Sequence, residues 1–170
     1  MAYFSFARSI IAGEPTTLFC TADSADALRD FTYIDDVVRG CLSALDTTGK
    51  SMGSKSGKKR EPAPLRVYSL GNTSPMPVTC MVAILEKLLG KKAHKRVVTM
   101  PTNGDVPFTH ANVSPAMREF GYHPATSLEV GLHHFVDWFV QYYKVDVRGG
   151  GNVLAGKTTK RKSMPMSTAL

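Results

Sequence analysis

The sequence has 170 residues, of which 43% are apolar, so it is long enough for one ordinary domain with its own core. Its formal charge of +7 lies mainly in two segments, because residues 47–62 carry +4 and residues 144–170 carry +5, which leaves −2 for the remainder. The part expected to fold is therefore not basic, which argues against a structured surface for nucleic acid. No apolar run reaches the ~18 residues that a membrane span requires.

The cysteines and histidines predict no metal or disulfide chemistry. Cys20, Cys41 and Cys80 are odd in number and form no Cys-x-x-Cys pair, so buried thiols are expected. The five histidines include no His-Glu-x-x-His pattern and no close acidic residue in metal-ligand spacing. They are expected at the surface or at an interface.

The chain starts with a predicted helix at residues 2–12 that ends at Gly13, with Phe6, Ile10 and Tyr3 on one face. A first element with no strand before it is typical of a fragment, although an ordinary N-terminal helix would look the same. Short strands are predicted at 16–19 and 29–32, and a loop at 21–28 separates them.

Residues 35–45 are predicted to form an amphipathic helix that starts with Asp35 and Asp36. Its apolar face is expected to contain Val37, Val38, Cys41, Leu42 and Leu45. The stretch 47–64 is rich in Gly, Ser, Lys and Pro and has no periodicity, so a mobile basic surface loop is expected there.

A strand is predicted at 65–70, followed by a turn. Thr79 is expected to cap a helix that runs to Gly90, and residues 95–100 resemble a further strand.

Ser114 is expected to cap a short helix with Pro115 at its first position and Gly121 at its end. Residues 126–129 have the capping-box pattern and begin the last helix, which has a broad apolar face. The order of these elements predicts one α/β unit over residues 1–143. The Gly-rich and basic composition of residues 144–170 predicts a disordered tail.

One segment matches a nucleotide-binding pattern by its letters alone, and we call this match a decoy. Residues 151–158, Gly-Asn-Val-Leu-Ala-Gly-Lys-Thr, satisfy the phosphate-loop pattern letter for letter. A phosphate loop needs a strand before it and a helix N-terminus after it, whereas here a Gly-rich tail precedes and basic residues follow. ATP binding is therefore not expected.

The segment 29–36, Arg-Asp-Phe-Thr-Tyr-Ile-Asp-Asp, carries more information. Its charges could simply be those of a strand end and a helix start. It also resembles the corresponding segment of the extended short-chain dehydrogenase/reductase sugar epimerases. Later motifs follow the same order, namely Val67–Pro75, Asn103–Asn112, Phe120–Pro124 and the helix Ser127–Tyr143.

This resemblance covers roughly residues 1–145 and is best to the plant UDP-glucuronate 4-epimerases, which have a basic loop where residues 47–62 lie. It implies the C-terminal, substrate-binding lobe of that fold, with the Rossmann half largely absent. Full-length members combine NAD with a Tyr-x-x-x-Lys pair to epimerise UDP-glucuronate to UDP-galacturonate. The resemblance also implies that full-length plant members are Golgi membrane proteins that supply a pectin precursor.

The residues of the catalytic half can be searched for directly. No tyrosine of the 170 residues has a lysine four positions later, and no strand leads into a Gly-x-x-Gly-x-x-Gly turn. The chain by itself is therefore expected to carry neither an NAD site nor the catalytic pair.

The resemblance does imply substrate-binding residues at the UDP end. Arg29 would meet the pyrophosphate, Asp105 would accept hydrogen bonds from the ribose, and Thr109 and Tyr33 are weaker candidates. Relatives often carry a basic residue near Thr102, so phosphate affinity would rest more heavily on Arg29. Asp105 could instead cap a turn after glycine.

Three functions stay open at this point. The first is a UDP-sugar-binding fragment of an enzyme. That enzyme would be a UDP-glucuronate 4-epimerase or another UDP-sugar epimerase or decarboxylase. The second is a non-catalytic module that pairs with an intact epimerase or with itself, because such a lobe would expose apolar surface. Binding of nucleic acid or anionic lipid by the basic segments ranks last.

Overall fold

The structure is a computed structural model that describes residues 2–47, 66–101 and 106–145. The predicted loop at 47–64 and tail at 144–170 lie almost entirely outside these ranges and stay predictions, as does the decoy at 151–158. The elements in chain order are α1 (Ala2–Ala12), β1 (Pro15–Cys20), β2 (Leu28–Arg29), α2 (Ile34–Asp46), β3 (Met76–Pro77), α3 (Val78–Leu89), β4 (His94–Thr99), α4 (Ser114–Phe120) and α5 (Leu128–Tyr143).

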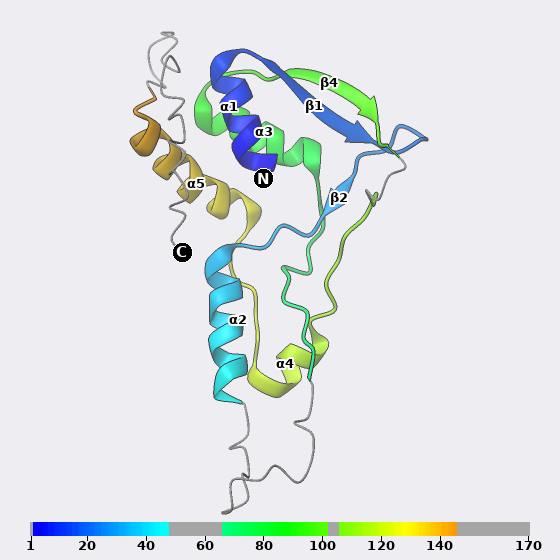
Figure 1. Ribbon diagram of the computed structural model, residues 1–170, viewed down its shortest axis with the longest axis vertical. Helices are drawn as coiled ribbons and strands as arrows, with labels where there is room; N and C mark the ends of the chain where they lie inside the picture. The colour runs from blue at the N-terminus through cyan, green and yellow to red at the C-terminus, as the bar shows by residue number, and fades with distance from the viewer. Residues whose placement is uncertain (1, 48–65, 102–105, 146–170) are drawn as a thin grey trace, which may run out of the picture.

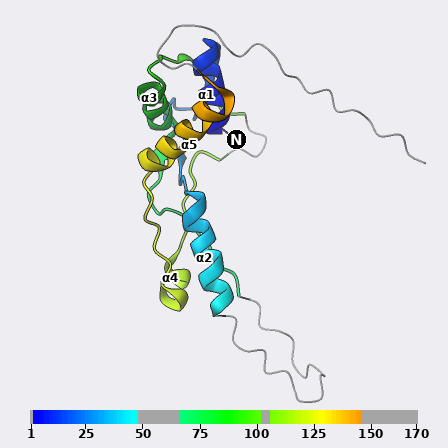
Figure 2. The same ribbon diagram turned by 90° about the vertical axis from the view of Figure 1, so that its left-hand side faces the viewer.

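The molecule is elongated and has two parts (Figures 1 and 2). The upper part contains α1, α3 and α5 with the parallel pair β1 and β4, whose register runs from Pro15 opposite His94 to Cys20 opposite Thr99. The lower part contains α2 and α4. The short antiparallel pair β2 and β3, with Arg29 opposite Met76, lies where the chain passes between the two parts.

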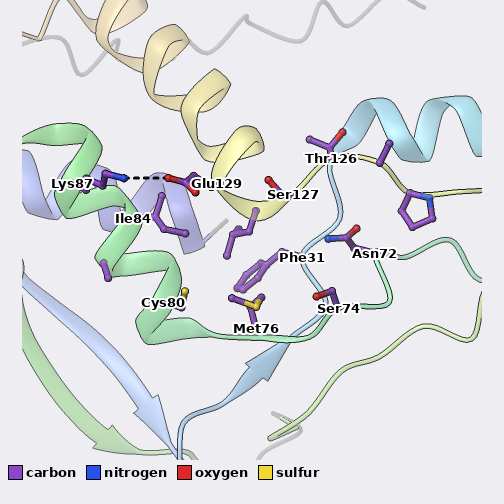
Figure 3. A pocket seen from close by; sticks show the side chains of 14 residues that line it. Phe31, Asn72, Ser74, Met76, Cys80, Ile84, Lys87, Thr126, Ser127 and Glu129 are labelled. Carbon is purple, nitrogen blue, oxygen red and sulfur yellow. Dashed lines mark hydrogen bonds and ion pairs between the residues drawn. The ribbon is translucent and has the colours of Figure 1, made fainter.

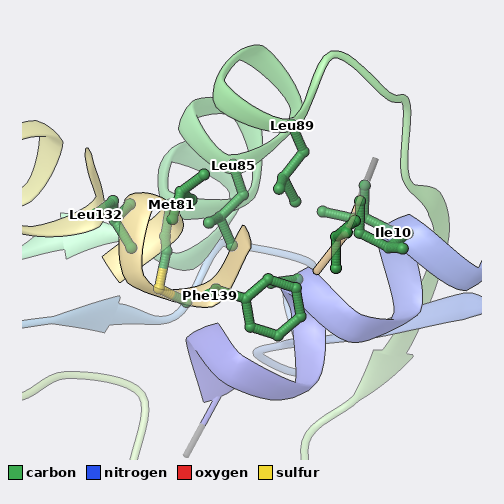
Figure 4. Packing of buried hydrophobic residues seen from close by; sticks show 10 residues of the cluster. Ile10, Met81, Leu85, Leu89, Leu132 and Phe139 are labelled. Carbon is green, nitrogen blue, oxygen red and sulfur yellow. The ribbon is translucent and has the colours of Figure 1, made fainter. Parts of the chain in front are cut away.

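The main core fills the space between the three upper helices (Figure 4). Ile10 of α1, Leu85 and Leu89 of α3 and Phe139 of α5 are all at most 1% exposed. Burial of a large apolar side chain contributes about 1.5–3 kcal/mol, so this cluster is the main source of stability. The helices predicted for these three segments are confirmed.

A second, smaller cluster stabilises the lower part. Val113, Ala116 and Tyr122 are buried there, and Leu70 and Phe120 pack against them. The Tyr122 hydroxyl donates a hydrogen bond to the Gly71 carbonyl oxygen at 3.1 Å.

Helix α2 forms as predicted, but most of its apolar face does not pack against a core. Val38, Leu42 and Leu45 are 47%, 57% and 63% exposed. The helix instead buries Asp36 and Gly40. The reason is tertiary: the space beside Gly40 is occupied by the side chains of the second cluster, and Asp36 is hydrogen-bonded to the segment before α5.

Two strand predictions need correction. The strand predicted at 29–32 is limited to Leu28–Arg29. The strand predicted at 65–70 is absent from residues 66–70, which pair with no other strand among the described residues. Alternating apolar residues are typical of a strand, but a strand also needs a neighbour to receive its hydrogen bonds.

The helix ends agree with the glycine predictions, because Gly13, Gly90 and Gly121 have φ values of 70°, 63° and 66°. The starts differ. Thr79 does not cap α3, because its hydroxyl donates to the Asp26 carboxylate. Ser114 lies inside α4, and Val113 takes the cap position.

The cap of α5 is Ser127, one residue later than the capping-box pattern placed it. Its hydroxyl accepts a hydrogen bond from Val130 N at 3.3 Å. Among the helices of the described ranges, none combines the length and apolarity needed to cross a bilayer.

Candidate functional site

A cavity of about 510 Å³ lies between α1, β1 and β2. It is close to the paired strands β2 and β3, where the chain passes between the upper and lower parts, a region that we call the junction. Its walls combine aromatic rings, hydroxyl groups and one charge. The rings are those of Phe6, Phe19 and Phe31, the hydroxyl-bearing residues are Ser5, Ser9, Thr16 and Thr17, and the charge is that of Arg29. Such a mixture can hold a flat apolar ring and hydrogen-bond a polar ligand at the same time.

Arg29 is placed in this wall by the pairing of β2 with β3. Its Nη1 donates to the Leu28 carbonyl oxygen at 3.0 Å, and within the described ranges no carboxylate lies within ion-pair distance of it. It is half-buried, whereas the other arginines of those ranges are exposed. A guanidinium that is partly desolvated and has no counter-ion is suited to bind an anion.

The neighbouring Asp30 points into the junction rather than to solvent. Its carboxylate accepts backbone hydrogen bonds from Asn72, Thr73 and Ala111 at 3.1, 3.2 and 3.1 Å. Asp30 is therefore more than a charge at a strand end, which was the alternative that the sequence left open.

Asp36 has a similar role lower down. It is 1% exposed, and its two oxygens accept from Ala125 N and Thr126 N at 3.3 and 3.0 Å, while Arg39 forms an ion pair with it. Burial, followed by the charges of Asp36 and Asp30, raises the pKa of Tyr122 above its ordinary value of 10.0. Both carboxylates are therefore close enough to Tyr122 to affect its ionisation.

The other predicted site residues are not gathered around the cavity. The Thr109 hydroxyl accepts from Asp30 N at 3.0 Å, which places it directly behind Arg29. The Tyr33 ring lies over Gly131 of α5, and its centroid is 5.8 Å from that of His134. Asp105 lies outside the described residues. The structure therefore brings Arg29 and Thr109 together and places Tyr33 elsewhere.

A second cavity of about 700 Å³ lies on the other side of Phe31, between α3 and the start of α5 (Figure 3). Its charged lining residues, Lys87 and Glu129, form an ion pair at 3.3 Å. Its lysine charge is therefore already matched by a carboxylate. For an anionic ligand, the smaller cavity with the unpaired Arg29 is the stronger site despite its size.

Sequence reasoning missed the hydroxyl-bearing residues of α1 and β1 and the junction role of Asp30. The signal for the first was weak, because serine and threonine occur on any surface. The signal for Asp30 was present, because an aspartate directly after a strand can accept backbone N–H groups of neighbouring segments.

The part of the chain described by the structure contains no group of three or more His, Cys, Asp or Glu side chains that could hold a metal ion. Strand β1 leads through residues 21–27 into β2 and not through a glycine-rich turn into a helix N-terminus, which is the arrangement that holds a dinucleotide pyrophosphate.

No family model matches the chain, but individual proteins that resemble it include UDP-glucuronate 4-epimerases. UDP-glucuronate 4-epimerase 2 of Arabidopsis thaliana is 57% identical over 155 residues, which are 91% of this chain and 35% of that protein. UDP-glucuronate 4-epimerase 1 of the same plant is 58% identical over 143 residues, 84% of this chain and 33% of that protein. The chain thus spans about a third of the length of these curated relatives.

The fold comparison agrees. The crystal structure of UDP-glucuronic acid 4-epimerase from Bacillus cereus, in complex with UDP-glucuronic acid and NAD, matches 84% of this chain with a TM-score of 0.67 and 29% identity. The match covers 40% of that protein. The α/β fold of the extended short-chain dehydrogenase/reductases, predicted from the ordered motifs, is confirmed. The chain is therefore similar in sequence and fold to about a third of the length of the plant UDP-glucuronate 4-epimerases.

Proposed function

We propose that this chain is the UDP-sugar-binding lobe of a UDP-glucuronate 4-epimerase. The observation that supports this most is the half-buried Arg29, which has no carboxylate partner among the described residues and lines a cavity of aromatic rings and hydroxyl groups. The Bacillus cereus relative holds UDP-glucuronic acid in its crystal structure. A UDP-sugar has the features that this cavity can bind: a flat base, hydroxyl groups and a pyrophosphate.

In this proposal each part of the nucleotide has a counterpart. Arg29 binds the pyrophosphate through two N–H groups, which offsets its charge better than a single point charge would. The aromatic walls cover the base, and hydroxyl groups reach its polar edge or the ribose. Asp105 accepts from the ribose hydroxyls, and Thr109 and Tyr33 are weaker candidates for further contacts.

We also propose that the 170 residues do not catalyse epimerisation on their own. Hydride chemistry in the family is supplied by NAD, and the connection from β1 to β2 is not the glycine-rich turn into a helix that would hold its pyrophosphate. The sequence has no tyrosine followed four positions later by lysine. The chain's own contribution is to bind and orient the nucleotide, and the reacting groups have to come from another segment or another polypeptide.

The test is a calorimetric titration of the folded chain with UDP-glucuronate, UDP-glucose and UDP. Arg29→Ala is expected to lower the affinity for all three by about tenfold or more, because charge-assisted hydrogen bonds are lost. Arg118→Ala is the matched control, since Arg118 is an exposed arginine of α4. The proposal fails if the folded wild type shows no saturable binding, or if both variants bind like the wild type. The order of affinities for UDP-glucuronate and UDP-glucose tests which sugar the chain prefers.

A second candidate function is association with an intact epimerase, which the exposed apolar face of α2 favours. Ile34, Leu42 and Leu45 are 62%, 57% and 63% exposed on one helix. Apolar groups gathered on one helix face are typical of a protein interface. Co-expression with the full-length Arabidopsis thaliana relative would test this, with Leu42→Asp expected to weaken the complex and Val130→Asp of α5 as the control. Absence of any mixed complex would contradict this function.

A further inference from the structure

Asp30 joins three segments that are far apart in the sequence. Its Oδ1 accepts from Asn72 N at 3.1 Å, and its Oδ2 accepts from Thr73 N and Ala111 N at 3.2 and 3.1 Å. The first two donors belong to the turn before α3, and the third belongs to the segment before α4. One side chain therefore fixes the relative position of both segments and β2.

Residues 107–109 also hold the backbone around Asp30. Asp30 N donates to the Thr109 hydroxyl at 3.0 Å, and Leu28 N donates to the Pro107 carbonyl oxygen at 2.9 Å. Thr109 N in turn donates to the Leu28 carbonyl oxygen at 3.1 Å. Arg29 lies between these two anchored residues, so its backbone has little freedom to shift.

Gly71 packs closely against the Asp30 carboxylate and Ala111. A Cβ atom on Gly71 would lie 2.7 Å from Asp30 Oδ2 and 2.3 Å from the Ala111 Cβ. Within the described ranges Asp30 has no ion-pair partner, and its carboxylate accepts hydrogen bonds from backbone N–H donors. An ionised carboxylate offers only acceptors, whereas an amide in its place would set its own N–H groups against one or more of these donors.

We propose that Asp30 is the positioning residue for pyrophosphate recognition by Arg29, a role that rests on the proposed UDP-binding function. Successive residues of an extended segment point to opposite sides, so Asp30 reaches into the junction while Arg29 reaches into the cavity. A guanidinium binds two phosphate oxygens well only when it is held in one orientation. The anchoring of Asp30 supplies this rigidity, and it ties nucleotide binding to the arrangement of the two parts of the molecule.

The first test compares Asp30→Asn with Asp35→Asn, an equal loss of charge at an exposed residue of the same segment. Asp30→Asn is expected to lower the affinity for UDP by about tenfold while changing that for uridine by less than about threefold, because uridine has no phosphate for Arg29 to bind. Asp35→Asn is expected to bind both ligands like the wild type. A purely structural role for Asp30 would weaken both ligands equally.

Hydrogen exchange of the wild type gives a second test that does not depend on the variant's folding. UDP is expected to slow exchange of the Asn72 and Thr73 amides, which do not line the cavity of Arg29 but donate to Asp30. Uridine is expected to slow them less. The Arg118 amide in α4 serves as a reference that should not change.

The outcomes separate the two proposals. If the wild type binds no UDP, the proposed function fails and the role of Asp30 fails with it. If the wild type binds UDP but a folded Asp30→Asn protein binds it equally well, or UDP leaves the exchange of Asn72 and Thr73 unchanged, the positioning role is wrong and the proposed function stands.

Discussion

Replacement of Asp36 by alanine should destabilise the protein more than any other single loss of an acidic group on α2. The side chain is 1% exposed, and its removal leaves Ala125 N and Thr126 N without acceptors. Each unpaired buried donor costs about 1–3 kcal/mol. Entry of water and release of the buried charge from its desolvation penalty offset part of this sum. We therefore expect a loss of about 3 kcal/mol in the free energy of unfolding.

The ion pair with Arg39 should contribute little to this loss, because the Arg39 side chain is 58% exposed and solvent screens the interaction. Arg39→Ala should consequently cost no more than about 1 kcal/mol. Asp36→Asn keeps one acceptor oxygen and should lie between alanine and the wild type.

Urea unfolding followed by the fluorescence of the single tryptophan, Trp138 of α5, measures these differences. Asp35→Ala is the matched control, since it removes the neighbouring exposed acid from the same helix turn and should change stability by less than about 0.5 kcal/mol. If Asp36→Ala and Asp35→Ala unfold at the same urea concentration, then the buried hydrogen bonds of Asp36 do not stabilise the fold and our interpretation of α2 is wrong.

Two further predictions follow from buried polar groups of the upper part. The hydroxyl of Thr16 is buried without a hydrogen-bond partner, so the isosteric Thr16→Val should raise the free energy of unfolding by about 1 kcal/mol; a loss measured by urea unfolding would show that the hydroxyl has a partner. Although burial raises the pKa of Glu86, the hydrogen bond from Ala93 N and the charges of Lys95 and Lys92 outweigh it and lower this pKa below 4.5. A group whose pKa is lower in the folded state than in the unfolded state stabilises the protein at pH values above its unfolded-state pKa. This stabilisation is lost as the pH falls through the folded-state pKa. Urea unfolding at about pH 6 and below about pH 4 should therefore show a smaller acid-induced loss for Glu86→Gln than for the wild type, and equal losses would contradict this assignment.

Much of the upper part could be predicted from local signals. Apolar residues at helical spacing and glycines with positive φ are properties of a short stretch, so the extents of α1, α3 and α5 follow from the sequence within a few residues. The ordered motifs also sufficed for the family, because several of them have to occur in the same order for the resemblance to hold.

The candidate site was only partly predictable. Arg29 was identified by its motif, and the structure adds the cavity around it and the absence of a carboxylate partner within the described ranges. Thr109 was expected at the substrate, and the structure places its hydroxyl on the backbone of Asp30. The placement of Arg29 depends on the pairing of β2 with β3, and that of Thr109 depends on a hydrogen bond to a residue about 80 positions away; periodicity reveals neither.

The sequence by itself determined the extents of most helices to within about two residues, which family the chain resembles and which arginine to examine. Only the tertiary structure decided which side of α2 is buried, that residues 66–70 have no strand partner among the described residues, and that Asp30 and Asp36 are internal anchors. The physical reason is the range of the interactions. Helix periodicity and glycine stops act within a few residues, whereas burial and carboxylate satisfaction depend on which distant segments the fold brings alongside.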